Sequence, residues 1–384
     1  MRRRSLPAMP CLDRVRIGHN GPVTTTEATT PAPANDASSS RRATVMSITG
    51  LATSALIALL TVVPSPYAVG SAGPTFDTLG TVDGVELVDI SGAPTYPSTG
   101  ELRLTTVSVS RAGSQPFTLG RVLAAWASSR QYVVPQEQVF GTEEQEDVAS
   151  EQAQQEWISS QESATVSALE ALGHPVPATL TVAGTSEDSN AADLLEVDDV
   201  IIAVDGEPTA NFSDLVAAVG AREPGDEIAV TVLRDGAEVT ETFATLADAA
   251  GDAVMGVFID PDFDLPIDVT VQIDSVGGPS AGLMFSLGIM DRLTEQDELA
   301  GALVAGTGTI DATGDVGAIG GIDMKMIGAS DAGAQWFLAP VENCDDVRGN
   351  IPDGLRVVAV DTLDDAYEAI TRIGAGDADD LPGC

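Results

Sequence analysis

The chain has 384 residues, and its 58 acidic residues against 18 basic ones give a net charge of −40 at pH 7. Charge of this size and sign excludes a nucleic-acid binder that works by neutralising phosphates. Three Cys and two His exclude a disulfide-built scaffold and leave no residue pattern for a zinc site. The length predicts two or three folded domains.

An uncharged stretch near the N-terminus predicts a membrane anchor. Residues 45–63 (VMSITGLATSALIALLTVV) could cross the hydrocarbon core of a bilayer as one helix. Residues 1–44 carry seven Arg against three acids, so the positive-inside rule predicts that this tail is cytoplasmic and that the rest of the chain lies outside. The alternative interpretation is a cleaved signal peptide, with Ala68 and Ala72 near the cleavage position.

The first extracytoplasmic region, residues 74–172, opens with short strands. Strand-like runs at 85–90 and 102–110 are separated by turns rich in Gly and Pro. Within the second run, the alternation of apolar residues changes phase between Leu104 and Val107. This change predicts either a β-bulge or a strand that is covered on both faces.

Residues 173–248 predict a small domain of strand, helix, strand and strand. Its last two strands form a hairpin with Asp235 and Gly236 at the tip. The runs 199–206 (DVIIAVDG) and 224–226 (PGD) resemble a bacterial PDZ domain. PDZ domains take up an extended peptide as an added strand, so the resemblance implies peptide capture.

Two positions depart from the PDZ pattern. Asp198 stands where a Gly commonly precedes the Asp of this turn. The carboxylate-binding loop has a single candidate, residues 172–175, in which Pro175 has no amide to donate. Peptide capture and simple packing against a neighbouring domain therefore both stay open.

The third region, residues 251–374, carries the chemistry. A strand at 269–274 leads into a Gly-rich turn at 277–282, and a helix over 283–293 follows. Ser280 lies at this strand–turn–helix junction, where free amides and the helix dipole would favour an oxyanion. The alternative is a serine that only caps the helix.

Lys325 is the single lysine of the chain, and Met324 and Met326 flank it. Arg cannot act as a base because its pKa stays above ~12, whereas burial can lower the pKa of a Lys by up to ~3–5 units. A neutral amine beside a Ser hydroxyl can take its proton and return it to the leaving amine. The only His outside the membrane is His174, far from Ser280 in the sequence, so we set a Ser-His-Asp triad aside.

Three short motifs resemble the proteolytic domain of Lon proteases. They are residues 279–282 (PSAG), Thr307 with the Gly that follows it, and residues 320–325 (GGIDMK). In that family the Ser of the first motif is the nucleophile and the Lys of the last is the base. The resemblance therefore implies Ser280 as nucleophile and Lys325 as base, with Thr307 in a supporting role.

The order of anchor, PDZ-like and Lon-like parts is similar to the membrane-anchored, YlbL-like Lon-type (S16) proteases of bacteria. Lon-type domains often form rings, so the resemblance implies a homo-oligomer. Gly277 departs from the family, because many Lon sequences have an acid three residues before the Ser. A nucleotide-binding Walker A motif needs Lys before Ser or Thr, but Met326 follows Lys325, so we expect no nucleotide site.

The predicted fold is α+β and multidomain. The predicted parts are a disordered cytoplasmic tail (1–44), a transmembrane anchor (45–63), an extracytoplasmic N-terminal region (74–172), a PDZ-like β-rich domain (173–248) and a Lon-type α+β proteolytic domain (251–374). Cys344 and Cys384 both fall on the outer side, where they could pair, and the sequence does not decide whether they do.

We predict an ATP-independent serine endopeptidase that hydrolyses unfolded or exposed polypeptides outside the cytoplasmic membrane, with no metal or other cofactor. One alternative is a non-catalytic, membrane-tethered adaptor that binds peptides through the PDZ-like domain. Another is a protease that cleaves only itself near residues 64–74.

Overall fold

The computed structural model of the chain describes residues 37–82, 84–110, 118–141, 143–273 and 276–384. The chain divides into two compact units, residues 1–57 and 58–384. Most of the predicted cytoplasmic tail, residues 1–36, lies outside the described residues. The mixture of helices and strands confirms the predicted α+β class.

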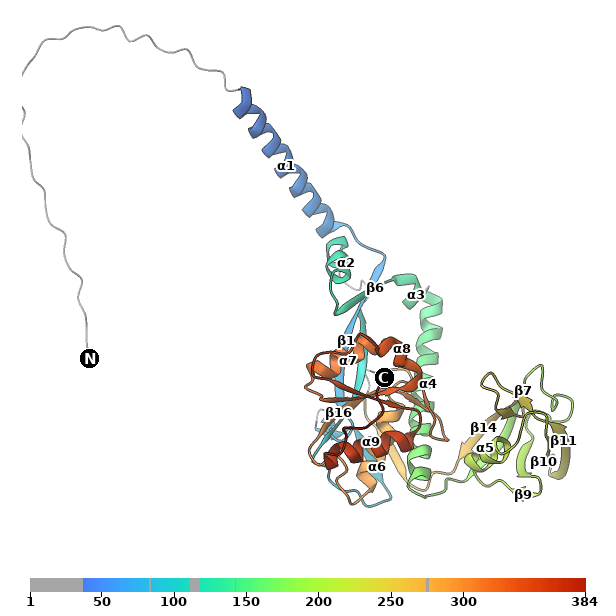
Figure 1. Cartoon of the computed structure of the whole chain (residues 1–384). Coiled ribbons are helices and arrows are strands. Elements are labelled where there is room, and N and C mark those ends of the chain that lie inside the picture. Colours follow the sequence, from blue (N-terminus) through green and yellow to red (C-terminus); the bar gives the residue numbers. More distant parts are fainter. Residues whose placement is uncertain (1–36, 83, 111–117, 142, 274–275) are drawn as a thin grey trace, which may run out of the picture. The chain divides into compact units, whose positions relative to one another are not determined.

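Helix α1 (Ala37–Val62) covers residues 45–62 of the predicted anchor, 45–63 (Figure 1). Its residues 41–62 are long and apolar enough to cross a membrane, and the window is fully exposed. The helix begins before Val45, the predicted start of the span, because the Ala, Ser and Arg residues of the tail's end continue it. Thr49 and Thr53 satisfy their hydroxyls by donating to the carbonyls one turn earlier, of Val45 and Thr49.

A mixed six-stranded sheet forms the centre of the second unit. Its order is β20 (Arg356–Val360), β19 (Trp336–Pro340), β16 (Leu303–Gly306), β5 (Glu101–Ser110), β1 (Tyr67–Asp77) and β6 (Gln131–Pro135). The first four strands are parallel, and β1 and β6 run antiparallel to their neighbours. Between Ala72 and Thr75, β1 has an extra residue opposite β5. The predicted bulge therefore exists, but it lies in β1. The change of phase that predicts it lies in the partner strand, β5.

This sheet joins segments that are far apart in the sequence. The blue β1 and the orange β16 of Figure 1 belong to one sheet, and β5 pairs with β16 from Glu101 to Leu104. Strand β5 therefore belongs to the same sheet as β16, although the sequence predicts a separate N-terminal region for it. Strand β4 (Val88–Ser91) likewise pairs with β15 (Asp268–Val271). In chain order, the PDZ-like residues are thus an insertion between strands of one sheet.

Helices cover both faces of the sheet. Along β16 the side chains of Val304 and Ala305 point to opposite faces, and they pack into two different apolar clusters. The first cluster contains α6 (Gly282–Leu293) and the second contains α7 (Ile322–Asp331). Helices α4 (Glu143–Ala171) and α9 (Leu363–Ala375) add residues to the first. The two faces thus hold the two helices on which the catalytic candidates depend.

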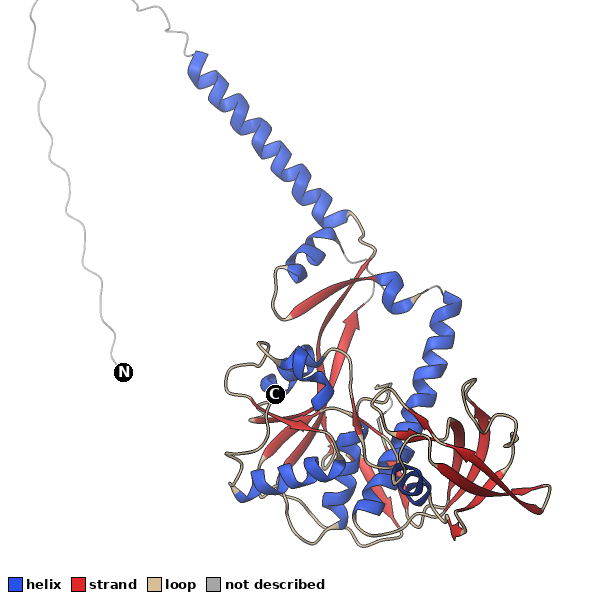
Figure 2. Cartoon of the chain, turned by 45° about the vertical axis from the view of Figure 1, so that its right-hand side comes forward, coloured by secondary structure: helices blue, strands red, loops and turns tan. Residues whose placement is uncertain are grey.

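Short elements complete the second unit (Figure 2). They are β2 (Thr81–Val82), β3 (Val85–Glu86), α2 (Leu119–Trp126), α3 (Gln136–Phe140), β12 (Leu246–Ala247), β13 (Ala253–Val254), β17 (Thr309–Ile310), β18 (Val316–Gly317), the 3₁₀ helix η1 (Val341–Asn343) and α8 (Cys344–Val347).

The PDZ-like part has its own sheet and core. Its strand order is β11 (Ala237–Ala244), β10 (Glu227–Arg234), β8 (Val200–Val204), β7 (Ala178–Thr185) and β14 (Val257–Phe263), with β9 (Glu207–Pro208) beside β8 and helix α5 (Phe212–Gly220). Asp235 and Gly236 form the predicted hairpin tip, and both have positive φ. Asp198 has a φ of 73°, which explains why the pattern commonly has Gly there; Asp tolerates this region better than most residues.

Packing inside the first cluster leads us to predict how one substitution changes the free energy of unfolding. Phe285 is fully buried on α6, and its ring meets that of Trp157 edge-to-face with centroids 5.4 Å apart. Phe285→Ala should lower the free energy of unfolding by about 3–5 kcal/mol, because it leaves a cavity in a packed core. Phe258→Ala is the control, since that ring is 60% exposed. Denaturant titrations that show equal losses for the two variants would contradict this account of the core.

Candidate active site

Ser280 lies in the turn that enters α6. Gly282 has no side chain, and this lets the turn lie close to the body of the domain. An added Cβ would lie 2.7 Å from Ile310 Cγ2 and 2.8 Å from Ser160 Oγ. Ser160 also donates a hydrogen bond to the Pro279 carbonyl, at 3.1 Å. A small residue is therefore required two positions after Ser280, and the turn leaves the Ser280 side chain half-buried at the surface of a cavity.

Lys325 lies in the second turn of α7 and is only 3% exposed. Its Nζ lies 2.7 Å from Ser280 Oγ and 2.8 Å from Thr307 Oγ1. Ser280 and Lys325 are 45 residues apart in the sequence, and they meet beside Thr307, the residue directly after β16.

Thr307 completes the group at that strand end. It is fully buried directly after β16, and its hydroxyl donates to the Ser280 carbonyl at 2.9 Å while it accepts from Lys325 Nζ. The amide of Gly308 donates to the same Ser280 carbonyl, at 3.0 Å. The backbone of the nucleophile candidate is thus fixed by two hydrogen bonds from one dipeptide.

Burial changes the acid–base chemistry of Lys325. Removal from water disfavours the ammonium form and lowers the pKa of Lys325 from its ordinary value to about 8. Within the described ranges no carboxylate forms an ion pair with its amine. A substantial neutral fraction therefore exists at slightly alkaline pH, and neutral amine is the form that can accept a proton.

A cavity of about 560 Å³ opens beside the two side chains. Among the described residues that line it, Lys325 is the one with a charge, and the others have small or apolar side chains. It is bounded by Thr105–Ser108 of β5, by the turn around Ser280 and by residues 318–320 before α7. The contribution of β5 was not predicted, because it depends on the long-range pairing of β5 with β16.

The expected set of free amides at the start of α6 needs correction. The amide of Gly282 donates to the Pro279 carbonyl at 3.2 Å, and that of Leu283 donates to the Gly308 carbonyl at 3.2 Å. These two groups are already occupied by the turn and by the neighbouring strand. His174, the other candidate considered in the sequence, is an exposed residue that does not line the cavity.

Comparison with known families agrees with both resemblances, to Lon proteases and to PDZ domains. Residues 261–372 match the Lon protease (S16) C-terminal proteolytic domain, and residues 174–244 match the PDZ domain. The Lon protease of Campylobacter concisus is 36% identical over 110 residues, which are 28% of this chain and 13% of that protein. The Lon protease of Malacoplasma penetrans is 34% identical over 121 residues, or 30% of this chain and 15% of that protein.

Solved PDZ domains also resemble part of the chain. The PDZ domain of an SdrC-like protein from Listeria monocytogenes has 18% identity and a TM-score of 0.20, and the alignment covers 21% of this chain and 86% of that domain. The chain is a mixed α+β protein, and its match to the Lon proteolytic domain indicates a serine-type peptidase. More particularly, this chain contains a Lon-type proteolytic domain and a PDZ domain, which confirms the predicted family resemblance. It spans only about one seventh of the two Lon proteases named above.

Proposed function

We propose that this chain is a membrane-tethered serine endopeptidase that works by a Ser280–Lys325 dyad, outside the cytoplasm and without ATP. The observation that carries the proposal is the 2.7 Å separation between Lys325 Nζ and Ser280 Oγ, with the amine almost completely buried. The match to the Lon proteolytic domain supports the class of reaction.

The dyad would act by nucleophilic catalysis. Neutral Lys325 takes the hydroxyl proton as Ser280 Oγ attacks the carbonyl carbon of the scissile peptide bond. The same amine then gives the proton to the leaving nitrogen, the C–N bond breaks, and an acyl ester remains on Ser280. Water deprotonated by Lys325 hydrolyses this ester, and its proton returns to Ser280 Oγ.

Thr307 would position the amine rather than react. Thr307→Val keeps the shape of the side chain but removes both hydrogen bonds of the hydroxyl. We expect kcat to fall by about 10–100-fold, since a hydrogen bond to a group that carries charge contributes about 1.5–3 kcal/mol. Thr307→Ser should retain most of the activity because it keeps the hydroxyl. Equal kcat for the valine and serine variants would show that the Thr307 hydroxyl does not contribute to catalysis.

The cavity favours an extended polypeptide as substrate. Strand β5 pairs with β16 only as far as Leu104, so the edge of Thr105–Ser108 that faces the cavity has no strand partner within the described ranges. Main-chain groups of an extended segment can pair with such an edge. A folded substrate presents no free strand there, so the proposed substrates are unfolded chains and exposed tails.

Location outside the cytoplasm is supported by two independent features. Helix α1 provides a candidate span. Cys344 and Cys384 form a disulfide, which answers the question that the sequence left open, and disulfides persist mainly in oxidising compartments. Mass spectrometry of the mature N-terminus tests the anchor, because an N-terminus after residue 63 would indicate cleavage of the span.

The PDZ domain would deliver peptides to the site. Within the described ranges, β7 pairs with β8 on one side and with β14 on the other, so a peptide has no free edge on β7. The predicted carboxylate-binding loop at 172–175 precedes this covered strand. The outer edge of β14 is the alternative position for an added strand, because β14 ends the sheet.

The direct test is hydrolysis of casein by the full-length chain in detergent, without nucleotide. A truncation at residue 74 is unsuitable because it would divide β1 (Tyr67–Asp77). We expect turnover that does not increase when ATP is added. Peptide binding without turnover would instead favour the non-catalytic adaptor, and a single cleavage near residues 64–74 would favour a protease that acts only on itself.

A further inference from the structure

One wall of the active-site cavity is a short loop between β18 and α7. Its residues Ala318, Ile319 and Gly320 line the cavity, and α7, which carries Lys325, begins two residues later at Ile322. At Gly321 the chain enters α7 with a φ of 70°, and an added Cβ would lie 3.0 Å from Val107 of β5. Gly320 and Gly321 contribute no side chain to the loop, and Ile319 packs against the second apolar cluster.

The side-chain amide of Asn343 binds the backbone of this loop. The Ile319 amide donates to Asn343 Oδ1 at 2.9 Å, and Asn343 Nδ2 donates to the Ile319 carbonyl at 3.0 Å. The neighbouring Glu342 accepts from the Ala318 amide at 3.1 Å. Asn343 is only 4% exposed, so its amide group is committed to this reciprocal pair. A carboxylate could accept from the Ile319 amide, but it could not donate to the Ile319 carbonyl.

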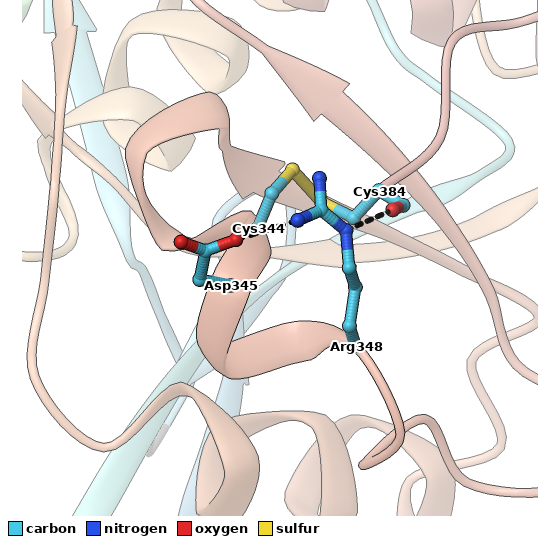
Figure 3. The surroundings of a disulfide bond; sticks show 4 residues. All are labelled: Cys344, Asp345, Arg348 and Cys384. Atoms are coloured by element: carbon cyan, nitrogen blue, oxygen red, sulfur yellow. Dashed lines mark hydrogen bonds and ion pairs between the residues drawn. A yellow bond between two sulfur atoms is a disulfide. The ribbon is translucent and has the colours of Figure 1, made fainter.

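The disulfide fixes the position of Asn343. Cys344 directly follows Asn343 and is bonded to Cys384, the last residue of the chain (Figure 3). Arg348 donates from Nε to the Cys384 carbonyl at 2.9 Å and forms an ion pair with Asp345 on the same helical turn (Figure 3). The C-terminal segment is also attached to β20, because the Ala359 amide donates to the Pro382 carbonyl at 2.9 Å.

We propose that Asn343 is a positioning residue for substrate binding, and that the Cys344–Cys384 disulfide maintains its position. The pair Asn343–Ile319 keeps residues 318–320 in the shape that receives a polypeptide next to Ser280. Loss of the disulfide would release the segment around Cys384 from α8 and loosen this wall without removing either member of the dyad. The proposal rests on the peptidase function proposed above and adds a structural control of its substrate affinity.

The test compares four full-length proteins: wild type, Asn343→Ala, the double variant Cys344→Ser with Cys384→Ser, and Asn350→Ala. Asn350 is the matched control, because it is exposed and its side chain donates only to the Asp346 carbonyl, away from the cavity. We expect KM for an unfolded peptide to rise about tenfold in Asn343→Ala and severalfold in the double variant, with kcat within about threefold. Asn350→Ala should match the wild type. A fall of kcat with unchanged KM would overturn the proposal.

Amide hydrogen exchange tests the same wall without catalysis. In Asn343→Ala, exchange of the peptide that contains Ile319 should accelerate at least tenfold, because its amide loses its acceptor. The double Cys variant should accelerate the same peptide to a smaller extent. If the wild type hydrolyses no peptide, the proposed peptidase function fails, while this measurement still decides the role of Asn343. Unchanged exchange in Asn343→Ala would disprove the positioning role.

Discussion

Lys325→Arg will reduce casein hydrolysis by at least about a thousandfold, even though the substitution keeps the positive charge. Arginine holds its proton at every pH at which the protein is folded, so it cannot accept the proton of Ser280. Its planar group is also larger than an ammonium, in a site where Lys325 Nζ already lies within 2.8 Å of two hydroxyls. Ser280→Ala removes the nucleophile and should cause a loss of the same size.

Combining Ser280→Ala with Lys325→Arg should lower the rate of hydrolysis no further than either single substitution, because the two residues act as a unit in the same step. Ser286→Ala is the matched control. Ser286 is a buried serine on α6, the helix that follows Ser280, but its hydroxyl bonds to Ser167 and to the Gly282 carbonyl rather than to Lys325. Initial rates of casein hydrolysis and circular dichroism spectra give the comparison. Activity in Lys325→Arg above about a tenth of the wild-type rate would show that Lys325 is not the base.

Local patterns in the sequence were sufficient for the elements that carry the dyad. Helix α6, predicted over 283–293, runs from Gly282 to Leu293. The start of α9 has an equally local signal, a capping box formed by Thr362 and Asp365. Signals of this kind depend only on neighbouring residues, so they survive any tertiary arrangement. The PDZ hairpin with Asp235 at its tip was predictable for the same reason.

Long-range pairing could not be predicted from these patterns. Gly73 and Pro74 form the bulge of β1 opposite Thr106, where an added Cβ on Gly73 would collide with the Thr106 hydroxyl. Residues 257–263 fall in the predicted proteolytic domain (251–374), but as β14 they pair with β7 of the PDZ sheet. Asn343 left no signal, because its role depends on a loop 24 residues earlier.

The value of kcat/KM will rise with pH up to about 8 and then level off. Burial lowers the pKa of Lys325 to about 8, and only the neutral amine can accept the Ser280 proton. Below that pH the ammonium form predominates, so activity should fall nearly tenfold for each pH unit, or about fiftyfold between pH 8 and pH 6. An acidic optimum would require a base with a much lower pKa than this amine has.

A second buried group could imitate part of this profile, so the test needs a control. Burial and the nearby Glu298 raise the pKa of Asp291 to about 7, and Asp291 is buried at the far end of α6 from Ser280. Asp291→Asn removes that titration and should leave the inflection near pH 8 in place. Stability must be followed in parallel: the lowered pKa of Lys325 means that the unfolded chain binds the extra proton between pH 8 and about 10.5, so its contribution to stability increases with pH across that window. If the inflection moves or disappears in Asp291→Asn while the protein stays folded, the profile does not report Lys325.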